Sequence, residues 1–103
     1  MAVYSFKELQ TKIAKCNSDD LYVRICRNIK RIRKEKYREF KRVSDNGSIN
    51  PYTTENIAAL LRYNHTHYKR FESENDSTKK IPLKKLVLLS IILETSIEDL
   101  MKK

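Results

Sequence analysis

A shortage of glycine and proline limits the folds open to this chain. It contains one glycine and two prolines in 103 residues. An all-β domain needs many tight turns, which favour these two residues, and a phosphate-binding loop needs several glycines whose bare backbone approaches the phosphate. Neither type of structure has the residues that it requires here. We therefore predict an all-α protein, and at this length a single compact core.

Two helices are predicted in the N-terminal part of the chain. Ser5 and Glu8 form the pattern of a capping box, and apolar residues at helical spacing then predict a short helix over residues 5–16. After a polar interruption, a longer helix is predicted over residues 19–42. Its apolar stripe consists of Leu21, Tyr22, Ile25, Cys26, Ile29 and Ile32.

The remaining helices are predicted from their start and stop signals. Residues 44–51 contain Asn-Gly and Asn-Pro, which end a helix and turn the chain. Thr53 and Asn64 are good N-caps, and Pro82 suits the first turn of a helix. The predicted helices span residues 54–61, 65–73 and 82–94, with a final turn that begins at Ser96.

The charge is strongly positive. Lys and Arg total 22 against 13 Asp and Glu, a formal net charge of +9. Such a field attracts polyanions, and nucleic acid is the first partner to consider. Much of the positive charge lies in the helix predicted over 19–42, where Glu35 and Glu39 are the acidic residues among the cations. This excess of cations favours contact with phosphates over a solvated surface. The cations of this helix are Arg24, Arg27, Lys30, Arg31, Arg33, Lys34, Lys36, Arg38, Lys41 and Arg42.

Membrane and secreted classes lack support in the sequence. The longest apolar run, residues 86–93, is far shorter than the ~20 residues of a membrane span, and residues 1–15 lack the pattern of a secretory signal. We therefore expect a cytoplasmic protein that has no membrane partner. Cys16 and Cys26 are then reduced, and without the spacing of a metal or redox site they are expected to be small buried hydrophobes.

Catalytic and metal sites are also not expected. His65 and His67 lie two residues apart, so they point to different sides of a helix, and no cysteine or acidic cluster near them completes a metal site. The sequence offers no recognisable nucleophile with its base. We predict that the chain is not an enzyme and uses no cofactor and no small-molecule substrate.

The two short helices, joined by about three residues, have the spacing of a helix-turn-helix. From about residue 25 to residue 100 the sequence resembles the lambda-repressor-like family, of the xenobiotic-response-element type. The segments that are similar to the family's five helices in order are ICRNIKRIRKEK (25–36), TTENIAALL (53–61), NHTHYKRFE (64–72) and, for the last two, IPLKKLVLLSIILETSIEDL (81–100). The matching apolar positions are Ile29, Ile57, Ala58, Leu60, Tyr68, Phe71, Leu86, Leu93, Ile97 and Leu100, and Glu72 stands where the family usually has glutamate.

The resemblance implies a compact five-helix domain over residues 19–103, to which residues 1–18 add an accessory N-terminal helix. The first helix of the domain is elongated and basic, because residues 37–52 replace what is usually a tight connection. Arg62 replaces the glycine that is common in the turn between the second and third helices, at a backbone position that often has φ > 0.

The resemblance also implies which residues contact DNA. The helix over 65–73 enters the major groove, and the base-reading positions fall on His65, Thr66 and Arg70, with Lys69 on the same face. Thr54 matches a position that contacts phosphate at a helix start. Further phosphate contacts are expected from Arg62, Asn64, Lys34, Lys36, Arg38 and Lys79.

These residues predict a sequence-specific regulator of transcription that binds double-stranded DNA and represses by occupying an operator. The alternative is a protein-interaction module, such as an antitoxin or a nuclease inhibitor, whose basic surface binds an acidic protein partner. A third hypothesis is nucleic-acid binding without sequence preference, which has the same dependence on salt.

The helix predicted over 82–94 has more apolar surface than one buried side requires. Its core-facing residues are predicted to be Leu83, Leu86, Leu89 and Leu93, and Leu88, Ile91 and Ile92 extend the apolar surface. A homodimer would cover this surface and place two recognition helices about one DNA turn, roughly 34 Å, apart. Alternatively, the helix over 5–16 folds back and covers it with Phe6, Leu9 and Ile13.

Overall fold

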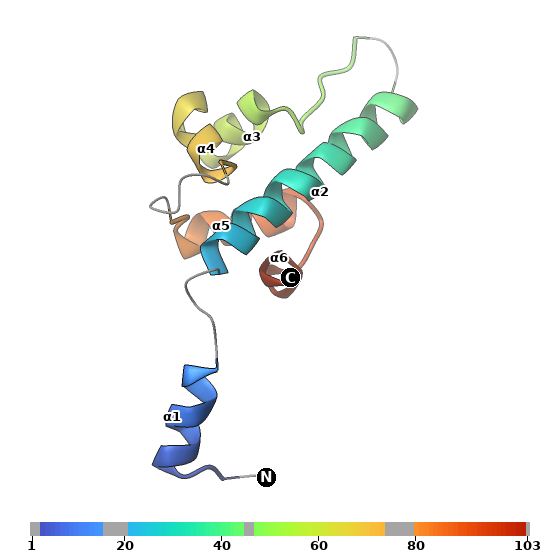
Figure 1. Ribbon diagram of the computed structural model, residues 1–103. Helices are drawn as coiled ribbons and strands as arrows, with labels where there is room; N and C mark the ends of the chain where they lie inside the picture. The colour runs from blue at the N-terminus through green and yellow to red at the C-terminus, as the bar shows by residue number, and fades with distance from the viewer. Residues whose placement is uncertain (1–2, 16–20, 45–46, 74–79, 103) are drawn as a thin grey trace.

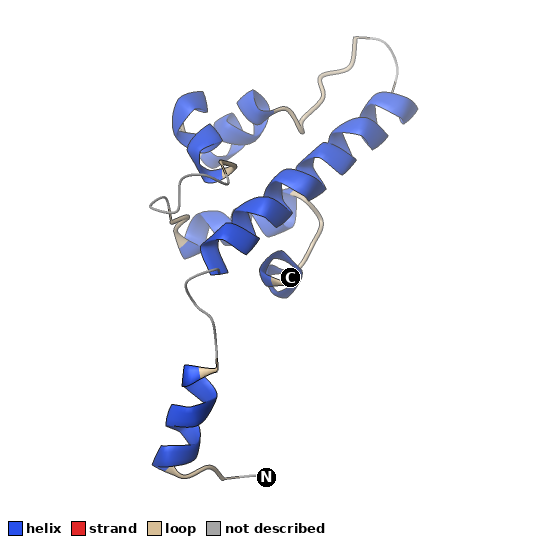
Figure 2. Ribbon diagram, in the orientation of Figure 1, coloured by secondary structure: helices blue, strands red, loops and turns tan. Residues whose placement is uncertain are grey.

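The computed structural model describes residues 3–15, 21–44, 47–73 and 80–102. Within these ranges all regular structure is helical, as Figure 2 shows, so the all-α prediction is confirmed. The helices are α1 (Phe6–Ala14), α2 (Leu21–Val43), α3 (Thr54–Leu61), α4 (His65–Phe71), α5 (Leu83–Ile92) and α6 (Ile97–Met101). None of them combines the length and the apolarity that crossing a bilayer requires.

Helix α2 is the longest helix, and α3 to α6 lie around it (Figure 1). Helices α3 and α4 pack against each other beside α2, α6 packs against α2, and α5 contacts both α3 and α6. The core lies where these five helices meet. Each contributes a side chain that is 0% exposed: in chain order these are Ile29, Ile57, Tyr68, Leu89 and Leu100.

The predicted helix starts are confirmed by their caps. The side-chain oxygens of Ser5, Thr53, Asn64 and Ser96 accept hydrogen bonds from backbone N–H groups three residues later, at 3.1, 3.1, 2.6 and 3.0 Å. Each bond satisfies one of the amides that a helix start leaves without a partner. Pro82 is itself the N-cap of α5, so that helix begins one residue later than predicted.

Two predicted core positions are wrong. Leu60 is 54% exposed, and Leu61 is fully buried instead, because α3 turns inward the face that contains Ile57 and Ala58. Leu83 is 69% exposed because Leu86, Leu89 and Leu93 set the inward direction of α5. Leu88 and Ile92, which were expected to extend the exposed surface, are half-buried against the core.

The C-terminal part of α2 extends past the other helices, and residues 47–53 return along it (Figure 1). Asn50 Nδ2 donates to the carbonyl oxygen of Tyr37 at 3.1 Å, and the rings of Phe40 and Tyr52 meet edge to face at 6.4 Å. Of residues 37–52, which were expected to be an insertion, the first part thus continues α2 and residues 47–52 lie along it.

Helix α1 stands apart from the other helices, and none of its residues is buried (Figure 1). Phe6, Leu9 and Ile13 are 78%, 44% and 71% exposed, so in this structure α1 does not cover α5. Cys26 is buried, as predicted, whereas Cys16 and the proposed boundary between residues 18 and 19 lie outside the described residues.

Candidate nucleic-acid interface

A turn of three residues, Arg62 to Asn64, joins α3 to α4. Arg62 adopts the left-handed conformation, with φ 61° and ψ 40°, at the position where the sequence lacks the expected glycine. The N–H groups of Arg62 and Tyr63 donate to the carbonyl oxygens of Ala59 and Ala58, at 3.1 and 2.9 Å, which closes the end of α3. Asn64 then caps α4, so only these three residues separate the two helices.

The outward side of α4 is polar and accessible. Thr66, Lys69 and Arg70 are exposed, while Tyr68 and Phe71 on the opposite side are buried in the core. A surface hollow of about 350 Å³ is lined by Thr66 and Arg70 together with Asn64 and His67. Three of the four predicted base-contacting side chains therefore reach solvent from one rigidly held helix.

The fourth, His65, contacts another predicted site residue. Its Nε2 lies 2.6 Å from the Thr54 hydroxyl oxygen, and its Nδ1 lies 3.8 Å from a carboxylate oxygen of Glu55. The His65 side chain is 38% exposed. This contact ties the first residue of α4 to the first residue of α3, so the two helix N-termini open on the same side.

A buried ion pair holds the far end of α4. Arg33 Nε and a second guanidinium nitrogen donate to the two carboxylate oxygens of Glu72, at 2.6 and 2.9 Å. The third nitrogen of Arg33 donates to the carbonyl oxygen of Tyr52 at 3.1 Å. The prediction that Arg33 is one of the outward cations of α2 is therefore wrong, because its charge is neutralised inside the protein. Nothing in the local sequence distinguishes Arg33 from its exposed neighbours.

Tyr68 lies beside this pair and is fully buried. Burial, together with the negative charge of Glu72, raises the pKa of Tyr68 far above its ordinary value. Its hydroxyl has no hydrogen-bond partner of good geometry within the described part of the chain. A neutral phenol is the form that the surrounding core accepts.

Aromatic rings and a lysine fix the other side of α4. The ring of Tyr63 lies 4.5 Å from His67 and 5.5 Å from Phe71, between ring centres. Lys85 of α5 lies 5.1 Å above the Tyr63 ring and donates to the carbonyl oxygen of Leu61 at 2.7 Å. A cation at the end of α3 complements the negative end of its dipole. These contacts hold α3, α4 and α5 in one arrangement.

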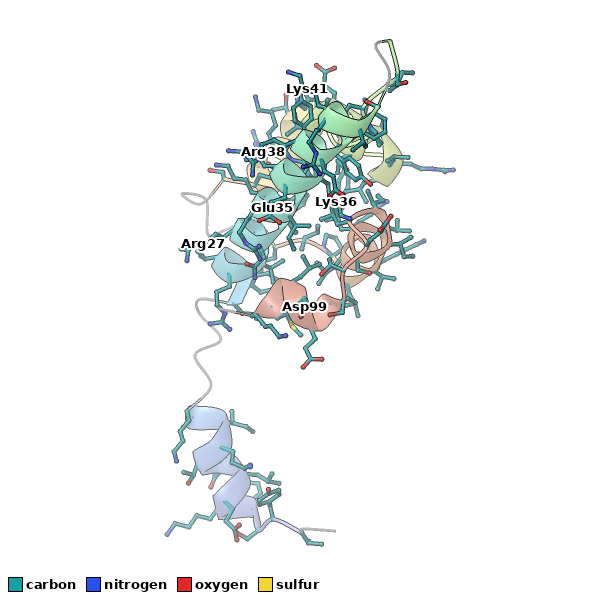
Figure 3. The ribbon with its side chains drawn as sticks, turned by 90° about the vertical axis from the view of Figure 1, so that its right-hand side faces the viewer. Arg27, Glu35, Lys36, Arg38, Lys41 and Asp99 are labelled. Carbon is teal, nitrogen blue, oxygen red and sulfur yellow. The ribbon has the colours of Figure 1, made fainter. Side chains whose placement is uncertain are left out.

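A line of cations runs along one flank of α2. We call the α2 stripe the series Arg27, Lys30, Lys34, Arg38 and Lys41, which recurs every three or four residues and so lies along one side of the helix. It is about 21 Å long at the rise of an α-helix. Figure 3 shows Arg27, Arg38 and Lys41 on this flank. Glu35 and Glu39 lie next to this flank: they line one surface hollow with Arg38 and Arg42, and Figure 3 shows Glu35 between Arg27 and Arg38.

The α2 stripe meets α3 and α4 at one surface hollow of about 260 Å³. Lys30, Thr54, Lys69 and Ser73 line this hollow together with the buried pair of Arg33 and Glu72. The structure therefore brings Thr54 and Lys69, both predicted from the sequence, together with Lys30, which was not singled out. The signal for Lys30 was its spacing from Lys34, but its nearness to α4 depends on how α2 packs.

The other predicted phosphate contacts are placed as follows. Lys34 and Arg38 belong to the α2 stripe, and Arg62 and Asn64 are exposed in the turn between α3 and α4. Figure 3 shows that Lys36 points away from the stripe. Its Nζ lies 3.5 Å from a carboxylate oxygen of Glu94. Lys79 lies outside the described residues. No group of three or more metal-ligating side chains was found within the described ranges.

Comparisons with known proteins give no match: no family model, no curated protein and no solved structure is similar enough to this chain to assign it to a family.

Proposed function

We propose that this chain is a helix-turn-helix regulator of the lambda-repressor-like kind, which binds double-stranded DNA and represses transcription by occupying an operator. In this proposal α3 crosses the phosphate backbone and α4 enters the major groove. The observation that carries it is the outward side of α4. Thr66, Lys69 and Arg70 are exposed on a helix whose opposite side is buried and whose two ends are held by side-chain contacts.

The exposed groups of α4 suit the edges of base pairs. The guanidinium of Arg70 can donate two hydrogen bonds to guanine, and Thr66 can donate, accept or touch the methyl group of thymine. Each good contact of this kind is worth roughly 1–3 kcal/mol of discrimination against a wrong base. That discrimination requires a helix held in one position, because side chains on a helix that moves can adapt to several bases.

The surface around α4 suits the phosphate backbone. The hollow lined by Lys30, Thr54 and Lys69 lies at the N-terminus of α3, where the helix dipole also favours an anion. The α2 stripe continues from Lys30 through Lys34, Arg38 and Lys41. Contacts of this type position the protein and make its affinity fall steeply with salt, but they carry no sequence information.

The test is competition binding with a site selected from a random DNA pool. Arg70→Ala and Thr66→Ala should each reduce the preference for the selected site over random DNA by roughly tenfold or more, since each removes a base contact. Lys7→Ala, an exposed cation of α1, is the matched control and should leave the preference unchanged. An unchanged preference in Arg70→Ala and Thr66→Ala would show that α4 does not read the sequence.

The same experiment separates the alternatives. Binding that depends steeply on salt but shows no preference for any sequence indicates non-specific nucleic-acid binding. No measurable DNA affinity at low salt rejects DNA as the partner, and the cationic surface is then better explained by an acidic protein partner.

A further inference from the structure

Two apolar surfaces of this chain are uncovered. We call the α1 face the series Phe6, Leu9 and Ile13, which are 78%, 44% and 71% exposed. We call the α5 stripe the series Leu83, Val87 and Ile91, which are 69%, 39% and 67% exposed. Each series recurs at helical spacing, so each forms a continuous band along one side of its helix. Bands of this kind mark places where another surface binds.

Local contacts alone stabilise helix α1 only weakly. It has nine residues and no buried side chain. Isolated helices shorter than ~12–15 residues are marginal in water, because too few hydrogen bonds offset the cost of nucleation. The cap at Ser5 supports the start of α1, but one cap stabilises a helix by only about one kilocalorie per mole in general and does not remove this limit. A persistent α1 therefore requires a surface that covers its apolar face.

The α5 stripe fits this requirement. The α1 face is about 10 Å long from Phe6 to Ile13, and the α5 stripe is about 12 Å long from Leu83 to Ile91, at the rise of an α-helix. One band has the spacing i, i+3, i+7 and the other i, i+4, i+8, so each runs nearly along its helix axis and the two can face each other over their whole length. Each side chain of this size that becomes buried is worth about tenfold or more in an equilibrium constant.

We propose that α1 of one copy packs on the α5 stripe of a second copy, and that the second copy returns the same contact. In the structure α1 stands apart from α5 of its own chain (Figure 1). Each copy has one α1 face and one α5 stripe, so a reciprocal exchange about a twofold axis covers both bands on both copies and leaves none exposed. The accessory helix is thus a dimerisation arm.

The test is analytical ultracentrifugation of the full chain, without nucleic acid, so its outcome does not depend on the proposed function. The wild type should be a dimer at micromolar concentration. Phe6→Asp/Ile13→Asp, which alters α1, and Leu83→Asp/Ile91→Asp, which alters α5, should each weaken the dimer at least a hundredfold. All four side chains are exposed in the monomer, so α2 to α6 should stay folded, and circular dichroism should change by no more than the loss of the nine residues of α1. Ile49→Asp, at an 80% exposed apolar residue outside both bands, should dimerise like the wild type.

Mixing the two double variants distinguishes exchange from folding back. In the mixture one intact α1 face meets one intact α5 stripe, so reciprocal exchange predicts that dimers reappear with a single contact. A wild-type monomer, a dimer that survives the α1 changes, or a mixture that stays monomeric would each overturn the proposal. The first outcome would point to α1 docking on its own chain, and the second to direct contact between two α5 stripes.

Discussion

The ion pair between Arg33 and Glu72 is expected to be the most sensitive polar contact in this fold. Its two hydrogen bonds measure 2.6 and 2.9 Å, and the side chains are 10% and 7% exposed. Glu72→Gln keeps the shape of the side chain but removes its charge, which leaves the guanidinium of Arg33 buried without a counter-charge. Removing one partner of a buried pair generally costs ~3–5 kcal/mol, and since glutamine still accepts a hydrogen bond we expect about 3 kcal/mol.

Urea unfolding followed by far-UV circular dichroism measures this loss. For a domain of this size the same loss lowers the melting temperature by about 12 °C or more. Glu35→Gln is the matched control, because Glu35 pairs with Arg31 at 3.4 Å but both side chains are more than half exposed. Exposed pairs contribute ~0.2–1 kcal/mol, so the control should change the free energy of unfolding by less than about 1 kcal/mol.

Replacing both charges completes the test. Arg33→Met/Glu72→Met leaves no buried charge, so it should recover most of the stability that Glu72→Gln loses, apart from the bond to the Tyr52 carbonyl oxygen. If Glu72→Gln costs no more than Glu35→Gln, the charges are hydrated in solution. The view that this pair holds α4 against α2 would then be wrong.

Three further variants test other features. Arg62→Gly should raise the free energy of unfolding by about 1 kcal/mol in urea, because a side chain at φ 61° is strained. Tyr68→Phe tests the raised pKa of Tyr68. The folded protein keeps the phenol proton of Tyr68 at pH values where the unfolded chain, with a pKa of about 10, has lost it. The free energy of unfolding of the wild type is therefore intact below pH 10 and falls above pH 10 by about 1.4 kcal/mol per pH unit. Urea titrations at several pH values should show that this slope is missing in the variant. Lys34→Gln/Arg38→Gln should reduce the slope of log affinity for DNA against log salt by up to about 1.8, measured by fluorescence anisotropy, and should leave sequence preference unchanged.

The helices and their starts were predictable because their signals are local. A cap acts over three residues, as between Thr53 and Asn56, and an amphipathic stripe is recorded in side chains three or four positions apart. The buried apolar side of α2, which contains Ile25 and Ile29, was predicted for this reason. The same local rule also marks Lys30, Lys34 and Arg38 as one flank, although the structure was needed to show which flank lies beside α4.

The errors arose where a local pattern had two readings. In α3, Leu60 and Leu61 are adjacent and equally apolar, so spacing alone does not say which one faces inward. In α5, apolar residues occur on almost every side, and only the positions of α2, α3 and α6 decide that Leu86 is buried and Leu83 is not. The apolar face of α1 is clear in the sequence, but none of the other described residues covers it.

By itself the sequence determined the all-helical class, the helix starts and the segregation of positive charge, because each depends on residues within about one helical turn of one another. The tertiary structure decided which charges are neutralised and which remain available to a ligand. Arg33 and Glu72 are 39 positions apart, and they pair only because the fold brings the end of α4 to the middle of α2 and excludes water from both groups. Burial changes the role of an arginine from a surface cation to an internal contact, and burial is a property of the whole fold.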